Sequence, residues 1–180
     1  TYDYSKDDYT TIPTGATRET RLEPNPSGGS EWLEREGYIA ANGEFVEHGK
    51  ATLWSNKQRI TKVHCAMFLH GKLHGPWNFY YEDGSDRTEE FYVHGRIHGV
   101  ARRWYENGDL ESERHYLNGG AHGSFRFWHR NRIVKEECAF VKNRRVGPFT
   151  IRDDDGFEIV SGRYESGQMV GTWKFGFQSI

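Results

Sequence analysis

Cysteine is scarce in this sequence of 180 residues, long hydrophobic runs are absent, and neither sign of charge dominates. The two cysteines, Cys65 and Cys138, are too few for a disulfide-stapled scaffold and fit no zinc-ligand spacing, so we expect free thiols. No uncharged apolar run is longer than Val63 to Leu69, whereas a membrane-spanning helix needs about 18 such residues. With a mean hydropathy of -0.88, the composition predicts one domain with a limited core and no membrane-spanning helix.

Charge is distributed unevenly along the chain, although the formal net charge is only -2. Residues 1–47 carry 4 basic and 10 acidic side chains, while residues 48–180 carry 20 basic and 16 acidic ones. We therefore expect an acidic arm before a mildly basic body, and such an arm can dock on its own chain as readily as on a partner. The basic excess is far below that of a general nucleic-acid binder, which argues against nucleic acid as a partner.

A period of 24 residues organises the sequence. Glycine recurs at this spacing at Gly75, Gly99, Gly123, Gly147 and Gly171. Four residues before each of these stands a second column: Gly71, Gly95, Gly119, Asn143 and Gly167. Asn tolerates a positive φ best after Gly, so the single exception keeps the pattern. An aromatic residue lies three positions before each member of the second column, and a fixed period of this length is typical of a repeat fold.

Each repeat is predicted to be one β-hairpin. Asp83-Gly84 and Asn107-Gly108 lie between runs rich in aromatic and β-branched residues, which is the signature of a two-residue type I′ turn. With these residues as the loop, the numbers of paired residues sum to 167, 215, 263 and 311 in successive hairpins. This rule places Tyr92 opposite Gly75, and an aromatic residue opposite each later strand glycine, so that a ring can lie over the glycine.

One face of the first strand of each hairpin is predicted to form the core. At every second residue this face carries Trp77 and Phe79, Ala101 and Arg103, Phe125 and Phe127, Phe149 and Ile151, and Trp173 and Phe175. The second pair lacks rings and predicts a thin place in the aromatic ladder.

The repeat resembles a known family. The pattern is an aromatic residue, two variable residues, Gly, Lys or Arg, a variable residue and His-Gly, followed by an aromatic strand and Asp-Gly or Asn-Gly. It resembles the MORN repeat, best at Phe91 to Gly99 and at Tyr116 to Gly123. The residue pattern is closest to the variant repeats of YwqK-type bacterial antitoxin proteins. The resemblance implies an all-β fold, an elongated single antiparallel sheet of consecutive hairpins, that binds proteins or lipids or dimerises and has no catalytic machinery.

Three segments are expected along the chain. Residues 1–30, with Tyr2, Tyr4 and Tyr9 and a Pro/Gly-rich end, are predicted to be an extended acidic arm and linker. Residues 31–47, with an Asn42-Gly43 turn, are expected to form a capping hairpin. Residues 48–180 form the MORN-like repeat domain of about five and a half repeats, whose first copy at His48-Gly49 is two residues out of phase. Because the last repeat stops after one strand, we expect an open edge at the C-terminal side.

The opposite face of the strands carries an aromatic and basic strip that is our candidate binding surface. Its members are Tyr80, Arg102, Trp104, Arg126, Trp128 and Arg152. Such a strip can hold a peptide, an anionic group or stacked bases. The pairing rule also places Arg102 opposite Glu113 and Arg126 opposite Glu137, which are ordinary cross-strand ion pairs. The pairing rule does not explain the tryptophans, which are the first candidates for contact with a partner or a docked arm.

Two further groups of residues invite a functional interpretation. His74, His98 and His122 recur at the period, but two strands separate successive members by about 10 Å, so we expect turn residues and no metal site. Residues 121–152 hold a local excess of basic side chains that can attract anionic lipid. Its members outside the strip are Arg130, Arg132, Lys135, Lys142, Arg144 and Arg145.

Three functions of different classes remain open. The first is a non-enzymatic protein-binding or scaffold module that uses the repeat sheet, because no nucleophile, phosphate loop or metalloprotease motif is present. The second is a self-assembling structural subunit that uses the C-terminal edge strand and the N-terminal arm. The third is an anionic-lipid module. No cofactor is expected for any of them.

Overall fold

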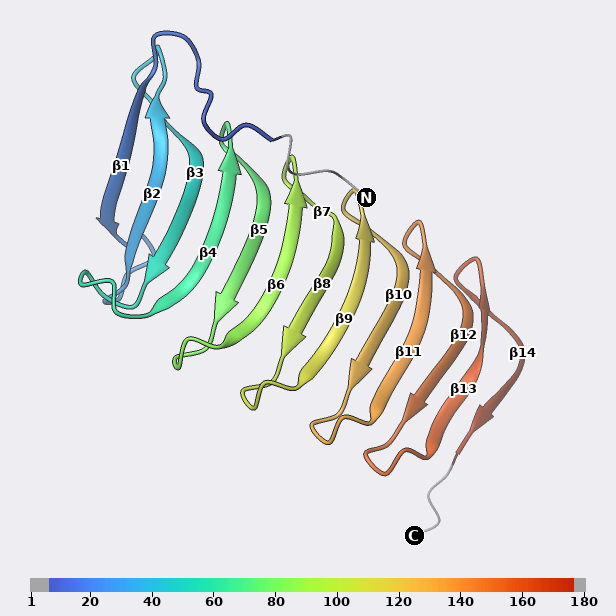
Figure 1. The fold of residues 1–180 in the computed structure, drawn as a ribbon. Coiled ribbons are helices and arrows are strands. Elements are labelled where there is room, and N and C mark those ends of the chain that lie inside the picture. The colour runs from blue at the N-terminus through green and yellow to red at the C-terminus, as the bar shows by residue number, and fades with distance from the viewer. Residues whose placement is uncertain (1–6, 177–180) are drawn as a thin grey trace. The chain divides into compact units, whose positions relative to one another are not determined.

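The computed structural model describes residues 7–176, and these residues form an all-β protein without a helix (Figure 1). Fourteen strands in this range make one open antiparallel sheet of consecutive hairpins. Their order in the sheet follows their order in the chain, except that the short β7 pairs with β6 and β8 comes next to β6 in the sheet. This arrangement confirms the fold class predicted from the 24-residue period. The same residues hold no helix with the length and apolarity needed to cross a membrane.

Two compact units make up the chain, residues 1–96 and residues 97–180. The strands that lie mainly in the first unit are β1 (Thr17–Pro24), β2 (Trp32–Ile39), β3 (Phe45–Trp54), β4 (Lys62–Leu69), β5 (Lys72–Tyr80), β6 (Asp86–Val93) and the short β7 (Arg96–Ile97). The strands of the second unit are β8 (Gly99–Trp104), β9 (Leu110–Leu117), β10 (Gly120–Trp128), β11 (Val134–Val141), β12 (Arg144–Arg152), β13 (Glu158–Glu165) and β14 (Gln168–Phe175).

The predicted register is confirmed in all four hairpins for which it was derived. Gly75 pairs with Tyr92, and Gly99 pairs with Tyr116. The same rule holds for the hairpin of β10 and β11 and for that of β12 and β13. The spacing of glycines and aromatic residues therefore fixes which side chains share a face.

The Asp-Gly and Asn-Gly turns differ from the two-residue type I′ turns that were predicted. In the first of them the Tyr81 amide donates to the Ser85 carbonyl and the Gly84 amide donates to the Tyr81 carbonyl, with Gly84 at a φ of +86°. These bonds define a three-residue loop, a type I turn followed by one left-handed residue. The register survives because Arg87 bulges out of the ladder and compensates for the extra loop residue.

Type I′ turns do occur, but at the opposite ends of the strands, where one hairpin connects to the next (Figure 1). His70 and Gly71 join β4 to β5 with φ values of +47° and +77°, and Leu69 pairs with Lys72 on either side of them. Lys142 and Asn143 join β11 to β12 in the same way, with φ values of +50° and +65°. The second glycine column therefore marks the type I′ turns, and its single Asn adopts the positive φ that was expected of it.

The first glycine column is explained by backbone conformation, and the prediction that an aromatic ring covers each strand glycine is wrong. Gly75, Gly99 and Gly123 have φ values of +111°, +84° and +106°. A Cβ atom added at Gly99 would meet nothing within 4 Å, so no ring fills the place of the missing side chain. Each glycine lies where the first strand bulges, and the positive φ alone disfavours other residues.

The core lies on the face predicted for it. In residues 97–176 its centre is Phe125, Cys138 and Phe149, and rings such as Tyr116, Phe140 and Trp173 pack around them. In residues 7–96 the rings of Trp77, Phe79, Tyr92 and His64 contact one another, next to the fully buried Ala66. Ala101 is also fully buried, so it fills its place in the ladder with little volume.

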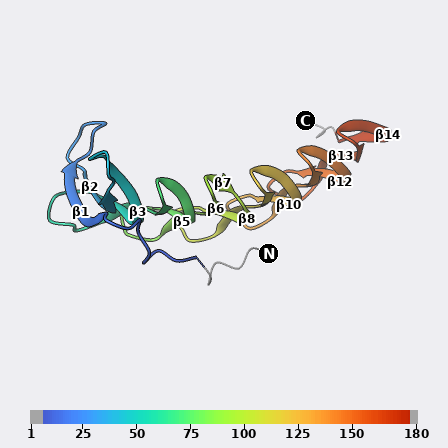
Figure 2. The ribbon, with the colours of Figure 1, turned by 90° about the horizontal axis from the view of Figure 1, so that it is seen from above.

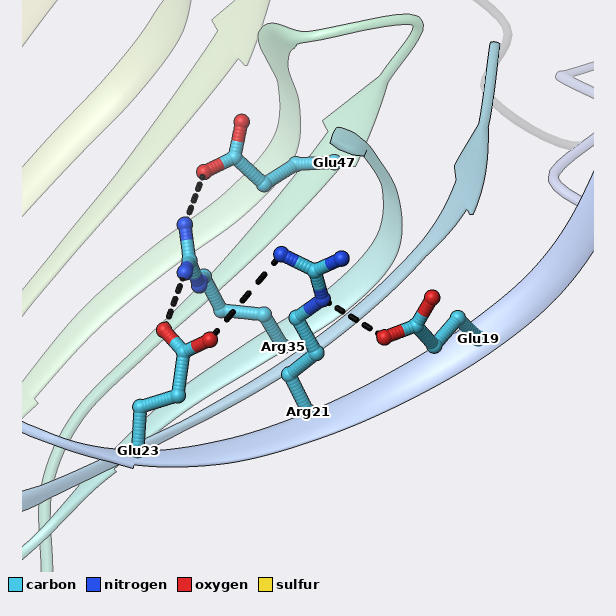
Figure 3. Close-up of polar contacts among 5 residues, drawn as sticks. All are labelled: Glu19, Arg21, Glu23, Arg35 and Glu47. Carbon is cyan, nitrogen blue, oxygen red and sulfur yellow. Dashed lines mark hydrogen bonds and ion pairs between the residues drawn. The ribbon is translucent and has the colours of Figure 1, made fainter. Parts of the chain in front are cut away.

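The structure corrects the boundary of the N-terminal arm, because the segment predicted to be arm and linker contains β1. β1 pairs along its whole length with β2, from Thr17 opposite Ile39 to Pro24 opposite Trp32. An ion pair between Arg35 of β2 and Glu23 of β1 links the two strands (Figure 3), and Arg35 also bonds Glu47 of β3. Arg21 bonds Glu19 at 2.7 Å within β1. Both guanidinium groups also lie over the ring of Phe45. Tyr2 and Tyr4 of the predicted arm lie outside the described residues.

The phase shift of the first repeat copy has a simple cause. The loop after β3 closes with a bond from the Ser55 amide to the Thr61 carbonyl, whereas the loop after β5 closes between Tyr81 and Ser85. The first loop is therefore two residues longer. His48-Gly49 still occupies the same place in its hairpin as His74-Gly75, since Gly49 pairs with Phe68 as Gly75 pairs with Tyr92.

Candidate interaction sites

The arginines of the predicted strip in residues 97–176 all contact glutamates. Arg102 Nε lies 2.9 Å from a carboxylate oxygen of Glu113, as the pairing rule predicts. Arg126 donates to Glu137 through Nε at 2.7 Å, and Arg152 Nη1 lies 3.3 Å from the other oxygen of the same carboxylate. These cross-strand pairs neutralise the positive charge of the strip.

The two tryptophans of the strip are half-buried and lie at the ends of their strands. Trp104 pairs with Leu110, and Trp128 pairs with Val134. The guanidinium of Arg126 lies 5.9 Å from the ring centroid of Trp128, and the Tyr105 hydroxyl donates to the Trp128 carbonyl at 2.7 Å. The indoles are thus held beside neutralised charges.

Tyr80, the remaining member of the strip, belongs to residues 1–96. It lines an open hollow together with Ser30, Ser55 and Lys62. Asn78, which precedes it on the same face, pairs with Glu89 as predicted.

The predicted anion patch does not form one cluster. Arg130 and Arg132 lie in the turn before β11, where Arg130 stacks over Tyr105 and Arg132 bonds Asp109 at 2.8 Å. Lys142 and Arg144 lie beyond the other end of β11, so the length of an eight-residue strand, about 25 Å, separates the two pairs.

The other two members of the patch, Arg145 and Lys135, differ in their surroundings. Arg145 bonds Glu136 at 3.6 Å and packs over the rings of Phe140 and Phe149. Lys135 is exposed near the start of β11. Counting the basic residues of 121–152 along the sequence therefore overestimates the positive charge at any one place on the surface.

The histidines that recur at the period lie in strand bulges, which corrects their interpretation as turn residues. His48 and His74 are fully buried and each precedes a glycine with a φ of +111°. The Nδ1 atom of His74 accepts the backbone amide of His94 at 3.2 Å, and that of His48 accepts the amide of His70 at 3.3 Å. Because Nδ1 accepts, Nε2 carries the proton and is the donor on each ring.

Residues 7–9 of the N-terminal arm meet these two donors. A carboxylate oxygen of Asp7 lies 2.8 Å from His74 Nε2, and the Tyr9 carbonyl oxygen lies 3.0 Å from His48 Nε2. The Tyr9 hydroxyl donates to the His74 carbonyl at 2.7 Å. A short extended segment is thereby bound across two consecutive hairpins. Figures 1 and 2 show the segment before β1 passing beside the ends of the strands where β3 and β5 begin.

The rest of the arm is held by polar contacts close to the surface. Arg18 donates to the carbonyls of Tyr9 and Thr10. The carboxylate of Asp8 accepts bonds from Thr10 and Thr11, and these bonds hold the pKa of Asp8 well below its usual range. The arm is therefore shaped by its own hydrogen bonds.

Electrostatics favour a neutral His48. Burial lowers the pKa of His48, and electrostatic repulsion from His70 and from Arg18 lowers it further. The bond to the Tyr9 carbonyl opposes this shift, because an imidazolium is the stronger donor. Within residues 7–176 no group of three or more His, Cys, Asp or Glu side chains has an arrangement that can hold a metal ion.

Asp7, Tyr9 and His48 were not among the candidate residues of the sequence. Two signals pointed toward them: the acidic excess of residues 1–47, and the out-of-phase His48-Gly49 copy. Neither signal identifies which side chains meet.

Residues 97–118 match the family model of the MORN repeat variant. The matched segment contains the hairpin of β8 and β9 with the His98-Gly99 bulge that opens it. The match therefore covers one copy, the one beginning at His98-Gly99, of the bulge, first strand, loop and second strand that recur along the sheet. No curated protein matches the chain significantly in sequence.

Proposed function

We propose that the chain is a non-enzymatic protein-binding module that receives a partner protein on its repeat sheet, with Trp104 and Trp128 at the centre of the contact. One observation carries the proposal: the arginines beside these indoles are already neutralised by Glu113 and Glu137. Tryptophan and arginine are enriched at the centres of protein interfaces, where paired charges are tolerated. A phosphate-bearing ligand instead requires cations that are free to bind it.

The MORN repeat supports a binding role, since this module is typically non-catalytic. Neutralisation of a toxin protein, which the YwqK-type resemblance implies, is one case of such binding. The anionic-lipid alternative has less support, because the basic residues of 121–152 lie at opposite ends of β11.

The test uses the full chain as bait to identify a binding protein, which is then purified and titrated by calorimetry. We expect Trp128→Ala to weaken binding at least tenfold and Trp128→Phe to weaken it less, because Phe keeps a ring. Arg163→Ala, an exposed position outside the strip, is the matched control and should leave the affinity unchanged. If the wild type and the three variants bound the partner with equal affinity, the contact would lie elsewhere.

Self-assembly is the second candidate, favoured by the edge strand β14. Within residues 7–176 β14 pairs only with β13, and its Met169 and Phe175 side chains are 54% and 58% exposed. An unpaired strand edge with exposed apolar side chains is a template for another strand. Light scattering should then show a mass that grows with concentration in the wild type and not in Phe175→Lys; a constant monomer mass would remove this candidate.

A further inference from the structure

The contact between the arm and the two buried histidines has the features of a ligand in a binding site. The three residues Asp7 to Tyr9 present one carboxylate, one backbone carbonyl and one hydroxyl to the sheet, and each has a partner there. The Asp7 side chain is only 8% exposed, and the His74 side chain is fully buried. A carboxylate buried against an imidazole is a specific contact, since any misfit leaves a buried polar group unsatisfied.

The receiving side of this contact is built without the arm. The Nδ1 atoms of His48 and His74 are bonded to amides of the sheet, so both rings are oriented before the arm arrives. Gly75 adds the space for the tyrosine, because a Cβ atom there would lie 3.0 Å from the Tyr9 hydroxyl. Preorganised donors and a fitted hollow reduce the cost of binding a peptide.

The arm itself is held loosely by comparison. Its residues Asp8, Thr10 and Thr11 are exposed, and residues 10–16 connect it to β1 without entering a strand. A segment with few buried apolar contacts and mostly exposed hydrogen bonds opens at a low free-energy cost. The arm can therefore leave the site while the sheet stays folded.

We propose that His48, His74 and Gly75 form a binding site for an extended segment of another polypeptide that carries Asp two residues before Tyr, and that the arm is a built-in competitor for it. The carboxylate recognises His74 Nε2, the carbonyl of the tyrosine recognises His48 Nε2, and the tyrosine hydroxyl recognises the His74 carbonyl. This site is distinct from the Trp104 and Trp128 surface and lies wholly in residues 7–96.

A labelled synthetic peptide with the sequence of residues 7–14 is the probe, and fluorescence anisotropy measures its affinity for the full chain. The tethered arm competes at an effective concentration of about 1 mM, which lowers the fraction of open sites in the wild type. In a full chain with Asp7→Asn and Tyr9→Phe the arm has a neutral acceptor in place of the carboxylate and loses the tyrosine hydroxyl, so one contact is weakened and another is removed. We expect the peptide to bind this double variant at least tenfold more tightly than the wild type.

Two sets of controls separate recognition from folding. Peptides carrying Asn for the first Asp, or Phe for the Tyr, should each bind the double variant at least fivefold more weakly than the parent peptide. Adding His74→Asn to the double variant keeps an acceptor for the His94 amide and removes the donor, and should abolish binding. His98→Asn, at the equivalent place in the next repeat, should have no effect.

Equal peptide affinity for the wild type and the double variant would overturn the proposal, and so would indifference to the Asp and Tyr replacements in the peptide. Because Trp128→Ala should leave peptide affinity unchanged, the peptide assay and the partner titration fail independently. A peptide that binds the wild type weakly and the double variant tightly, with both side chains required, would support the site.

Discussion

Alanine at two strand glycines tests the conclusion that backbone conformation, not ring packing, retains glycine in the first column. Gly99 and Gly123 occupy the same place in consecutive hairpins, with φ values of +84° and +106°. They differ in their surroundings. A Cβ atom at Gly99 meets nothing within 4 Å, whereas one at Gly123 lies 3.0 Å from the Cβ atom of His115.

The expected losses follow from these two differences. An L-residue in the left-handed region costs about 1–2 kcal/mol, so Gly99→Ala should lower the free energy of unfolding by that amount. Gly123→Ala adds a contact tighter than normal and a φ further from the left-handed well, so we expect about 2–3 kcal/mol. Ser124→Ala is the control at an exposed neighbouring position, where we expect a change within about 0.5 kcal/mol.

Guanidinium unfolding of the full chain, followed by tryptophan fluorescence, gives the overall loss. Repeat proteins depart from two-state unfolding, so hydrogen exchange of the β9 amides provides the local value. If Gly99→Ala were as stable as the wild type, positive φ would not be the reason for glycine at that position. Equal losses for Gly99→Ala and Gly123→Ala would show that the His115 contact relaxes without cost.

Three further predictions concern the core, a half-buried histidine and one turn. Phe149→Ala should cost about 3–5 kcal/mol in chemical denaturation, because Phe149 is 6% exposed at the core centre, and a loss below about 1 kcal/mol would contradict its packing role. Burial lowers the pKa of His64 from 6.5 to about 4, so the unfolded chain binds a proton first. Stability should fall by about 2 kcal/mol from pH 6.5 to pH 4, after allowance for partial solvent access, and an equal fall in His64→Phe would exclude His64 as its source. Arg132→Gly should raise the thermal midpoint, because Arg132 has a φ of +70° and its ion pair to Asp109 is 78% exposed on the arginine side, whereas a lower midpoint would mean that the ion pair outweighs the strain.

The register could be derived from the sequence because it depends on the centre of each turn and on period-2 alternation. The turn type could not, since Asp-Gly suits a type I′ turn as well as a type I turn with a left-handed residue after it. The turn at Asn131 and Arg132 shows the difference, because Arg132 stands where Gly84 and Gly108 stand in the earlier turns. Arg132 takes the single positive φ of a three-residue loop, while Asn131 has none, although a type I′ turn needs a positive φ at both residues.

The strand β1 was not predictable from hydrophobic patterning. Thr17–Pro24 has a single aliphatic side chain, Leu22, and the strand is attached to β2 by backbone pairing and by the ion pair between Glu23 and Arg35. Charge pairs give no periodic apolar signal, so an arm and a strand look alike in sequence. The arm contact was hidden for another reason, because the longer loop after β3 moved His48 out of phase with the later copies.

The histidine in the bulge at the start of a hairpin can use its two ring nitrogens for different purposes, one for folding and one for recognition. In the arm site, Nδ1 of His74 is bonded to the next turn and belongs to the fold, whereas Nε2 meets the arm. His98 has its Nδ1 atom 3.5 Å from the Asn118 amide, so the structural half of the pattern recurs in the next repeat. Replacing histidine by asparagine removes Nε2 and keeps an acceptor near the Nδ1 position. The same substitution therefore keeps an acceptor for the facing backbone amide at both His74 and His98, while only the first changes the binding of an Asp- and Tyr-containing segment.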